Sequence, residues 1–320
     1  MIPPRTQRAS PDPRPQTPDP MFTAQAQPDT IATPVQAADA LEQSQRTSLA
    51  ALRREAIDTL RLAGFSAPRT PRLFGASTKT EASRGVKVDT IVAYMLPGKL
   101  CPNASRQCLA ACLGTRSGML ALSPARRAQR WKSALLQLDP VLFLAIACAE
   151  ISAHLRACKR SGYVPAVRLD GSSDTGIGAL LAPYFPDAHF YDYTKSEARM
   201  MSDRPANYDL TFSRSEDNGD AVGRVLAAGQ KVAAVFAVRP KSERLGRPCA
   251  LPVGRTWMGA PIISGDAHDA RFRDPKPEPG VGLIVALSLK GSDAPFAKIR
   301  ERAGEFALDV SACDPVYLWG

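Results

Sequence analysis

Seven short apolar segments, each followed by polar residues, constrain the fold of this chain more than any other feature of its sequence. In chain order they are Asp89–Met95, Val164–Leu169, His189–Tyr193, Tyr208–Phe212, Val232–Val238, Pro261–Ile263 and Val281–Leu287. Such strands are typical of a mostly parallel sheet covered on both faces. We therefore expect an α/β fold. An irregular or partial (β/α) barrel is favoured because several connections are too short for a full helix, and an open doubly wound sheet is the alternative.

The chain divides into a tail, a helix and one large domain. Residues 1–38 are rich in proline and poor in apolar residues, which predicts a disordered tail. Residues 39–70 predict an amphipathic helix and a linker, because apolar residues recur there with helical spacing. Residues 71–320 then form a single α/β domain, in which Ser123-Pro124 and Asp139-Pro140 each begin a helix. These two helices are expected to end at Leu138 and near Lys159.

The positive charge of the chain is concentrated in one stretch. The formal net charge is +10, but residues 91–160 carry +8 and residues 161–220 carry −5. A basic stretch beside a carboxylate-rich one suggests a site that binds an anionic partner, nucleic acid included. Two solvated faces of opposite sign would give the same pattern.

Localisation is predicted from what the sequence lacks. Its longest apolar run, Val141–Ala149, is too short to span a membrane and is followed by Glu150. The first residues do not resemble a secretory signal. The seven cysteines suggest no compact disulfide framework. We therefore expect a reduced, cytoplasmic setting without a membrane span.

Three of the seven cysteines cluster as Cys101, Cys108 and Cys112. Three thiolates can hold an iron–sulfur cluster with one open iron, or zinc with a fourth ligand such as Cys249. Nearby basic residues would favour the thiolate form. Small buried thiols that pack near a helix start are the alternative. The remaining cysteines, and the histidines His154 and His189, are interpreted as structural.

Charged and hydroxyl side chains follow four of the predicted strands. They cannot all be core residues, because burying unpaired charges is expensive, so they are either solvated or paired in a cleft. Such a cleft could bind a polar or phosphorylated ligand and act on it. The candidate catalytic residues are Asp170, Asp174, Asp192, Lys195, Arg214, Glu216, Asp266, His268 and Asp269, and the candidate cofactor-binding residues are Arg168, Ser172 and Ser213.

Taken in order, these motifs resemble the gene product 88 family of phages and plasmids. The resemblance is carried from Ala76 to Lys290 by Cys-Pro-Asn-Ala-Ser, Arg-Leu-Asp-Gly-Ser-Ser-Asp, Phe-Tyr-Asp-Tyr-Thr-Lys, Asn-Tyr-Asp-Leu-Thr-Phe-Ser-Arg-Ser-Glu, Val-Ala-Ala-Val-Phe and Gly-Asp-Ala-His-Asp-Ala-Arg-Phe. It implies a mobile-element origin and not a particular reaction. The position of the cysteines after the first strand is also similar to that in radical S-adenosylmethionine barrels, whose cysteine spacing differs.

Three functions remain open from the sequence. The first is an iron–sulfur or metal-dependent enzyme, with or without S-adenosylmethionine, that acts on an anionic or nucleic-acid-related substrate. The second is a non-enzymatic effector that binds a host or rival-plasmid protein, for instance to inhibit conjugation. The third is a nucleic-acid binder that uses residues 91–160. It has little support, because that stretch offers few aromatic residues for base stacking beyond Trp131.

Overall fold

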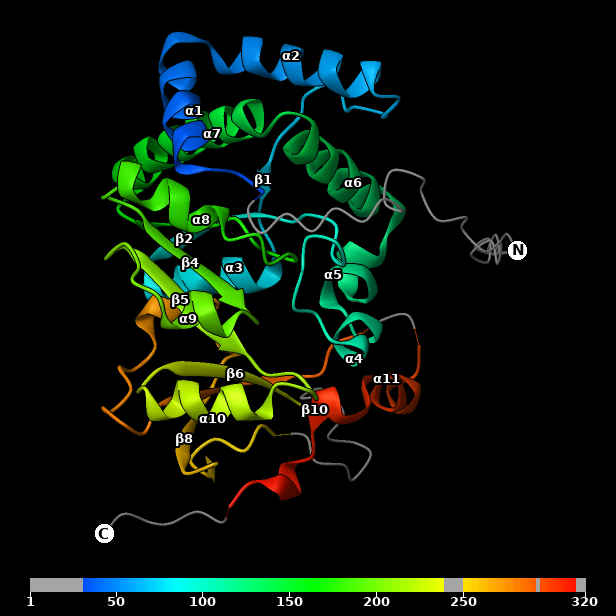
Figure 1. The fold of residues 1–320 in the computed structure, drawn as a ribbon, viewed down its shortest axis with the longest axis vertical. Coiled ribbons are helices and arrows are strands. Elements are labelled where there is room, and N and C mark those ends of the chain that lie inside the picture. Colours follow the sequence, from blue (N-terminus) through cyan, green and yellow to red (C-terminus); the bar gives the residue numbers. More distant parts are fainter. Residues whose placement is uncertain (1–30, 239–249, 292–293, 315–320) are drawn as a thin grey trace, which may run out of the picture.

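The computed structural model describes residues 31–238, 250–291 and 294–314, which form a mixed α/β fold around one sheet (Figure 1). Within these residues the sheet has ten strands, in the spatial order β1-β2-β3-β4-β5-β6-β9-β8-β7, with β10 also paired to β6. The strands are β1 (Phe74–Gly75), β2 (Val88–Ala93), β3 (Val164–Arg168), β4 (His189–Thr194), β5 (Tyr208–Ser213), β6 (Lys231–Phe236), β7 (Thr256–Trp257), β8 (Ala260–Ser264), β9 (Leu283–Ser288) and β10 (Ala307–Leu308).

The seven apolar segments of the sequence are β2, β3, β4, β5, β6, β8 and β9, and the expected parallel sheet is confirmed. Only the two-residue strands β1 and β7 pair antiparallel with their neighbours in the described part of the chain. Strands β2 to β6 lie side by side in chain order, as they would in an α/β barrel. The sheet is nevertheless open, so the expected barrel is not confirmed. One reason is that β9 lies between β6 and β8, which leaves the last long strand in the interior of the sheet.

Eleven α-helices surround this sheet in the described residues. They are α1 (Pro34–Arg46), α2 (Leu49–Leu62), α3 (Thr78–Ala82), α4 (Arg106–Ala110), α5 (Leu113–Arg116), α6 (Ser123–Leu138), α7 (Pro140–Ser161), α8 (Ile177–Leu181), α9 (Glu197–Met201), α10 (Gly219–Ala227) and α11 (Phe296–Ala303). Figure 1 shows α1, α2, α6 and α7 grouped together, whereas α4, α5 and α11 lie together at another side of the sheet.

The two helices expected in the domain are present. Helix α7 begins as predicted, because the side chain of Asp139 accepts a hydrogen bond from the Leu142 N–H at 2.9 Å. It ends at Gly162, whose φ of 71° suits a residue without a side chain. Helix α6 has the predicted bounds, but Ser123 lies inside it and Leu122 occupies the cap position without a side-chain bond.

The N-terminal segment differs from the expected single helix. It forms two helices, and the chain turns at Ser48, whose side chain caps α2 by accepting from the Ala51 N–H. The apolar face of α2 is buried as the spacing predicts. Residues 1–30 of the expected tail lie outside the described residues, and residues 34–38 are part of α1.

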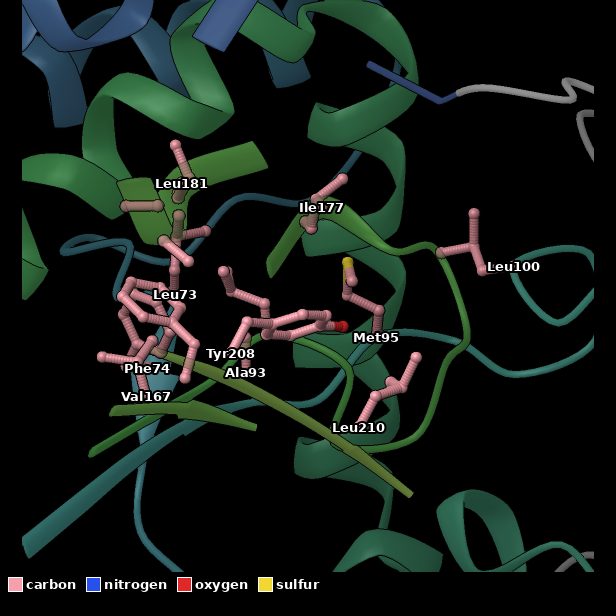
Figure 2. Close-up of a cluster of buried hydrophobic side chains, with 14 of the residues drawn as sticks. Leu73, Phe74, Ala93, Met95, Leu100, Val167, Ile177, Leu181, Tyr208 and Leu210 are labelled. Atoms are coloured by element: carbon pink, nitrogen blue, oxygen red, sulfur yellow. The ribbon is translucent and has the colours of Figure 1, made fainter. Parts of the chain in front are cut away.

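The main core lies between the sheet and the helices packed on one of its faces. Figure 2 shows buried side chains from β1, β2, β3, α8 and β5 gathered in this core. Leu100, which directly precedes Cys101, belongs to the same cluster and is 1% exposed. The core therefore fixes the start of the cysteine-containing segment.

Helix α7 is long and apolar enough to cross a membrane by length and composition alone, contrary to the sequence-based expectation that no segment would qualify. Of its most apolar window, 56% is buried inside the molecule. Burial of this extent is also found in core helices that do not enter a membrane, so the helix is weak evidence for a span.

Burial lowers the pKa of Lys132 in α6, and the effect can be tested. The residue is 7% exposed, and this burial lowers the pKa of its ammonium group to about 8, although the carboxylate of Glu150 opposes that shift. The folded chain therefore releases this proton more readily than the unfolded chain does. Relative to a chain in which Lys132 is replaced by Met, we expect the free energy of unfolding to rise between about pH 8 and pH 10 by about 2–3 kcal/mol.

Urea unfolding at a series of pH values would measure this effect. Lys132→Met should remove the contribution of this ammonium group and stabilise the chain at pH 7, while the buried thiols titrate equally in both chains. Lys159→Met, at an exposed position of α7, serves as the control. If the difference in unfolding free energy between wild type and Lys132→Met stays constant over this pH range, the prediction is wrong.

Candidate functional site

A segment that we call the three-Cys loop, residues 100–116, lies over the carboxyl ends of β3 and β5. Its start is fixed where the Asp174 N–H donates to the Leu100 carbonyl at 2.7 Å. The Cys101 thiol lies 3.7 Å from the Ser172 carbonyl oxygen. Near its end, a Cβ placed on Gly114 would lie 2.7 Å from the Ser172 Cβ, so a side chain there would displace the loop. The loop is thus packed directly on the turn after β3.

Glu216, expected to be catalytic, holds the middle of this loop. Its carboxylate accepts hydrogen bonds from the Ser105 hydroxyl at 2.6 Å and from the Gln107 N–H at 2.8 Å. Gln129 of α6 holds the other end by donating to the Gly114 carbonyl at 2.7 Å. The segment that carries the three thiols is therefore positioned from both β5 and α6.

Asp170 organises the turn after β3. It is 1% exposed, and its two carboxylate oxygens accept four hydrogen bonds from the residues that follow it. The donors are the hydroxyls of Ser173 and Thr175, at 2.6 and 2.9 Å, and the N–H groups of Thr175 and Gly176, at 3.0 and 2.8 Å. These bonds occupy the carboxylate, so Asp170 shapes the turn.

Asp192 of β4 lies beneath this turn. One oxygen accepts from the Asp170 N–H at 2.8 Å, and the other lies 3.4 Å from the Tyr208 hydroxyl. Burial, reinforced by the negative charge of Asp170, raises the pKa of Asp192 well above its usual range. Many groups that act in acid–base catalysis have a raised pKa. The Asp192 carboxyl group is only 1% exposed, however, so it is almost closed to solvent.

Asp174 and Lys195 lie closer to solvent than Asp192. Asp174 forms an ion pair with Arg199 at 2.5 Å and accepts from the Lys195 N–H at 2.9 Å. Burial raises the pKa of the Asp174 carboxyl group, although Arg199 opposes the shift. The Lys195 side chain is half-buried, and its ammonium group lies 5.9 Å from the centre of the Phe306 ring. Arg199 was not among the residues expected from the sequence.

Arg214 and the two candidate cofactor-binding serines have structural partners. Arg214 donates to the carbonyl oxygens of Glu305 and Phe306, and the second bond is 2.9 Å long. The Ser172 hydroxyl donates to the Met95 carbonyl at 2.5 Å. The carbonyl of Ser213 accepts from Asn218 at 3.0 Å. Ser172 and Arg214 therefore join separate segments at this end of the sheet.

Arg168 and Asp269 lie together on the opposite face of the sheet from the main core. Their side chains form a buried ion pair at 2.9 Å, and the Tyr191 hydroxyl donates to Asp269 at 3.0 Å. The segment after β8 covers this face and contributes Ala270 and Phe272 to a small apolar cluster. The structure thus separates Arg168 and Asp269 from the residues near the three-Cys loop.

Asp266 and His268 follow β8. One Asp266 oxygen accepts from the Ser288 N–H at 3.1 Å, and Lys290 lies 3.8 Å from the other. The carbonyl of His268 accepts from Arg271, a fully buried side chain. These contacts join β8, β9 and the segment between them.

The three thiols are neighbours, but their sulfur atoms do not converge as a single metal ion requires. Two thiolates on one zinc, at Zn–S distances of about 2.3 Å and tetrahedral angles, lie about 3.8 Å apart. Among the described residues, a group of three potential ligands within 4.8 Å of one another is found elsewhere. The thiolates of an iron–sulfur cluster bind different irons, so they need not approach one another as closely as the ligands of one zinc ion.

The expectation that basic residues favour the thiolate form does not hold for two of the thiols. Burial raises the pKa of Cys101 to about 12, and the carboxylates of Asp174 and Asp170 add to this shift. Burial also raises the pKa of Cys112, although the positive charge of Lys195 opposes it. These two thiols would lose their protons on binding a metal.

A pocket of about 860 Å³ lies beside the three-Cys loop, between α4 and α11. Its walls carry three basic and two acidic side chains. The residues that line it include Arg106, Gln107, Glu216, Lys298, Glu301 and Arg302. The sequence did not indicate this pocket, because α4 and α11 meet only in the folded chain.

The expected site residues thus fall into three places. The turns after β3 and β4, together with the three-Cys loop, bring together Asp170, Ser172, Asp174, Asp192, Lys195 and the cysteines. Arg214 and Glu216 connect this region to α4 and α11. The residues after β8, together with Arg168 at the end of β3, lie apart from both.

Comparison with known proteins identifies one family. The chain matches the family model described as gene product 88 over residues 71–304. No curated protein and no solved structure matches the chain.

Proposed function

The chain belongs to the gene product 88 family, and we propose that it is a phage or mobile-element enzyme that acts on an anionic substrate in the pocket beside the three-Cys loop. The family match supports a mobile-element origin. One observation carries the proposed reaction site. The three-Cys loop is tied to the turns after β3 and β5, and it forms one wall of a pocket with basic residues.

We infer that Cys101, Cys108 and Cys112 hold an iron–sulfur cluster. Such a cluster would supply an open iron for binding or electron transfer, since three thiolates leave one iron without a protein ligand. The three thiols do not form a group within 4.8 Å of one another, which supports a cluster over a single zinc ion. Lys195 contributes a positive charge beside Cys112. This charge lowers the pKa of Cys112, against the larger effect of burial, and so favours the thiolate form that would bind the cluster.

The charges of the pocket support an anionic substrate. Arg106 lies on α4, two residues before Cys108, and Lys298 and Arg302 lie on the facing helix α11. Glu216 is one of the two acidic side chains in the pocket, and its carboxylate is occupied by the loop. The basic side chains of the pocket outnumber the acidic ones, and this excess of positive charge would attract a phosphate or a nucleic-acid segment.

Iron and acid-labile sulfide analysis of anaerobically purified full-length chain tests this proposal. We expect iron and sulfide in equal amounts, with broad visible absorbance. Cys108→Ser should lose most of both, because a ligand of the cluster is removed. Cys313→Ser changes a buried thiol outside the loop and should retain them. Absence of iron and sulfide in the wild-type chain, or an unchanged content in Cys108→Ser, would reject the cluster.

A second candidate function is a non-enzymatic plasmid or phage effector, such as a conjugation inhibitor that binds a protein of the host or of a rival plasmid. One observation favours it: the carboxylates of Asp170 and Glu216 are occupied by hydrogen bonds within the chain. A chain that lacks iron and sulfide would support this function over the first. Both proposals place the chain in the cytoplasm, where thiols stay reduced.

A further inference from the structure

A second group of potential metal ligands lies at the other end of the sheet, away from the three-Cys loop. It consists of Asp89, the second residue of β2, and His154 and Cys158 of α7. One ligand atom from each of the three residues lies within 4.8 Å of the other two. The sequence predicts structural roles for His154 and Cys158, and the proposed function does not use them.

The helix places two of these ligands on one face. His154 and Cys158 are four residues apart, so they occupy successive turns of α7. The Cys158 sulfur lies 3.5 Å from Nε2 and 3.7 Å from Nδ1 of His154. Zinc bonds of about 2.3 Å to sulfur and 2.0 Å to nitrogen, at a tetrahedral angle, place those two atoms about 3.5 Å apart. The observed separations match this requirement.

The surroundings of the group suit a site that is closed on one side. Cys158 is fully buried and His154 is 8% exposed, whereas the Asp89 side chain is 24% exposed. His154 Nε2 lies 3.0 Å from the Asp89 carbonyl oxygen, a contact that ties the ring to β2. A fourth ligand such as water could reach the site from the Asp89 side.

Two side chains must move to admit a metal ion. The Asp89 carboxylate, now 3.0 Å from Arg84 Nε, has to turn inward, and the imidazole ring has to rotate until a nitrogen lone pair points toward the sulfur. The first movement is inexpensive, because the Arg84 side chain is 58% exposed and exposed ion pairs contribute little. Arg84 therefore competes with a metal ion for the carboxylate.

We propose that Asp89, His154 and Cys158 form a zinc site that fastens α7 to β2. Sulfur, nitrogen and oxygen donors together suit zinc, a borderline-soft ion that takes four ligands. The site lies at the amino end of β2, opposite the end that carries the three-Cys loop. The site therefore lies away from the proposed reaction site, and an ion bound by Asp89, His154 and Cys158 would hold α7 to β2.

Cobalt(II) titration of full-length, metal-stripped chain carrying Cys101→Ser, Cys108→Ser and Cys112→Ser tests this site alone. We expect strong visible bands of tetrahedral cobalt with a thiolate-to-cobalt charge-transfer band, and zinc should displace one equivalent. Cys158→Ala should abolish the charge-transfer band. Asp89→Asn should weaken zinc binding by at least about tenfold. Arg84→Ala should strengthen it, because the carboxylate is freed and a positive charge is removed.

Thermal unfolding of chains that keep the three loop cysteines provides a second test, in case the triple variant misfolds. Zinc should raise the thermal unfolding midpoint of the wild-type chain and of a Cys148→Ala control in α7 by more than that of Cys158→Ala. Absence of the charge-transfer band, or its persistence in Cys158→Ala, would overturn the proposal. Iron and sulfide at the three-Cys loop are measured separately, so either proposal can fail without the other.

Discussion

Asp170→Ala is expected to lower the free energy of unfolding by about 3–5 kcal/mol. The carboxylate accepts four hydrogen bonds within the turn after β3, and the residue is 1% exposed. Removing it leaves the buried N–H groups of Thr175 and Gly176 without their acceptor. Hydrogen bonds to a charged group contribute about 1.5–3 kcal/mol each, and they are not additive.

Urea unfolding followed by circular dichroism would measure this loss. Asp187→Ala, at an exposed acidic position before β4, is the matched control and should change the stability little. Asp170→Asn should fall between the two, because an amide keeps the shape but only one acceptor oxygen. If Asp170→Ala proves as stable as the control, the turn does not depend on this carboxylate. A catalytic role for Asp170 would then regain support.

Asp269→Ala is expected to cost about as much, 3–5 kcal/mol by order of magnitude, for a different reason. The substitution leaves Arg168, whose side chain is 12% exposed, without its ion-pair partner, and removes the acceptor of the Tyr191 hydroxyl. A buried charge without a partner is more costly than the absence of both charges. The double variant Arg168→Met with Asp269→Ala should therefore recover much of the loss.

The comparison with an exposed ion pair makes this prediction specific. Arg300→Ala removes the pair with Asp309, in which the side chains are 53% and 47% exposed, and should cost at most about 1 kcal/mol. Thermal or urea unfolding of the four chains would rank them. An Asp269→Ala variant no less stable than Arg300→Ala, or a double variant no better than Asp269→Ala, would contradict the proposed structural role of the pair.

The strands could be predicted from the sequence because their apolar side chains must be buried. All seven predicted segments became strands, although their ends shifted by up to two residues. Closure of the sheet could not be predicted in the same way. It depends on which distant strands pair, and the position of β9 between β6 and β8 leaves no trace in local composition.

The candidate site shows a similar division. The sequence correctly placed carboxylates after the strands, but it did not reveal which oxygens the chain itself would use. For Asp170 a signal was present, because Ser173, Thr175 and Gly176 supply the donors that a short turn after an aspartate often offers. For Glu216 no local signal existed, since its donors lie more than a hundred residues earlier.

The position of β9 also bears on how the chain acquires its structure during synthesis. Strands β2 to β6 can add one after another as they emerge from the ribosome, because each pairs with the strand made before it. Strand β8 is made before β9 but pairs with β9 and not with β6. Residues 260–264 must therefore wait, with an unpaired edge exposed, until residues 283–288 have been translated. During this interval the edge of β6 that later pairs with β9 is unpaired, and such an edge is a place where chains can associate.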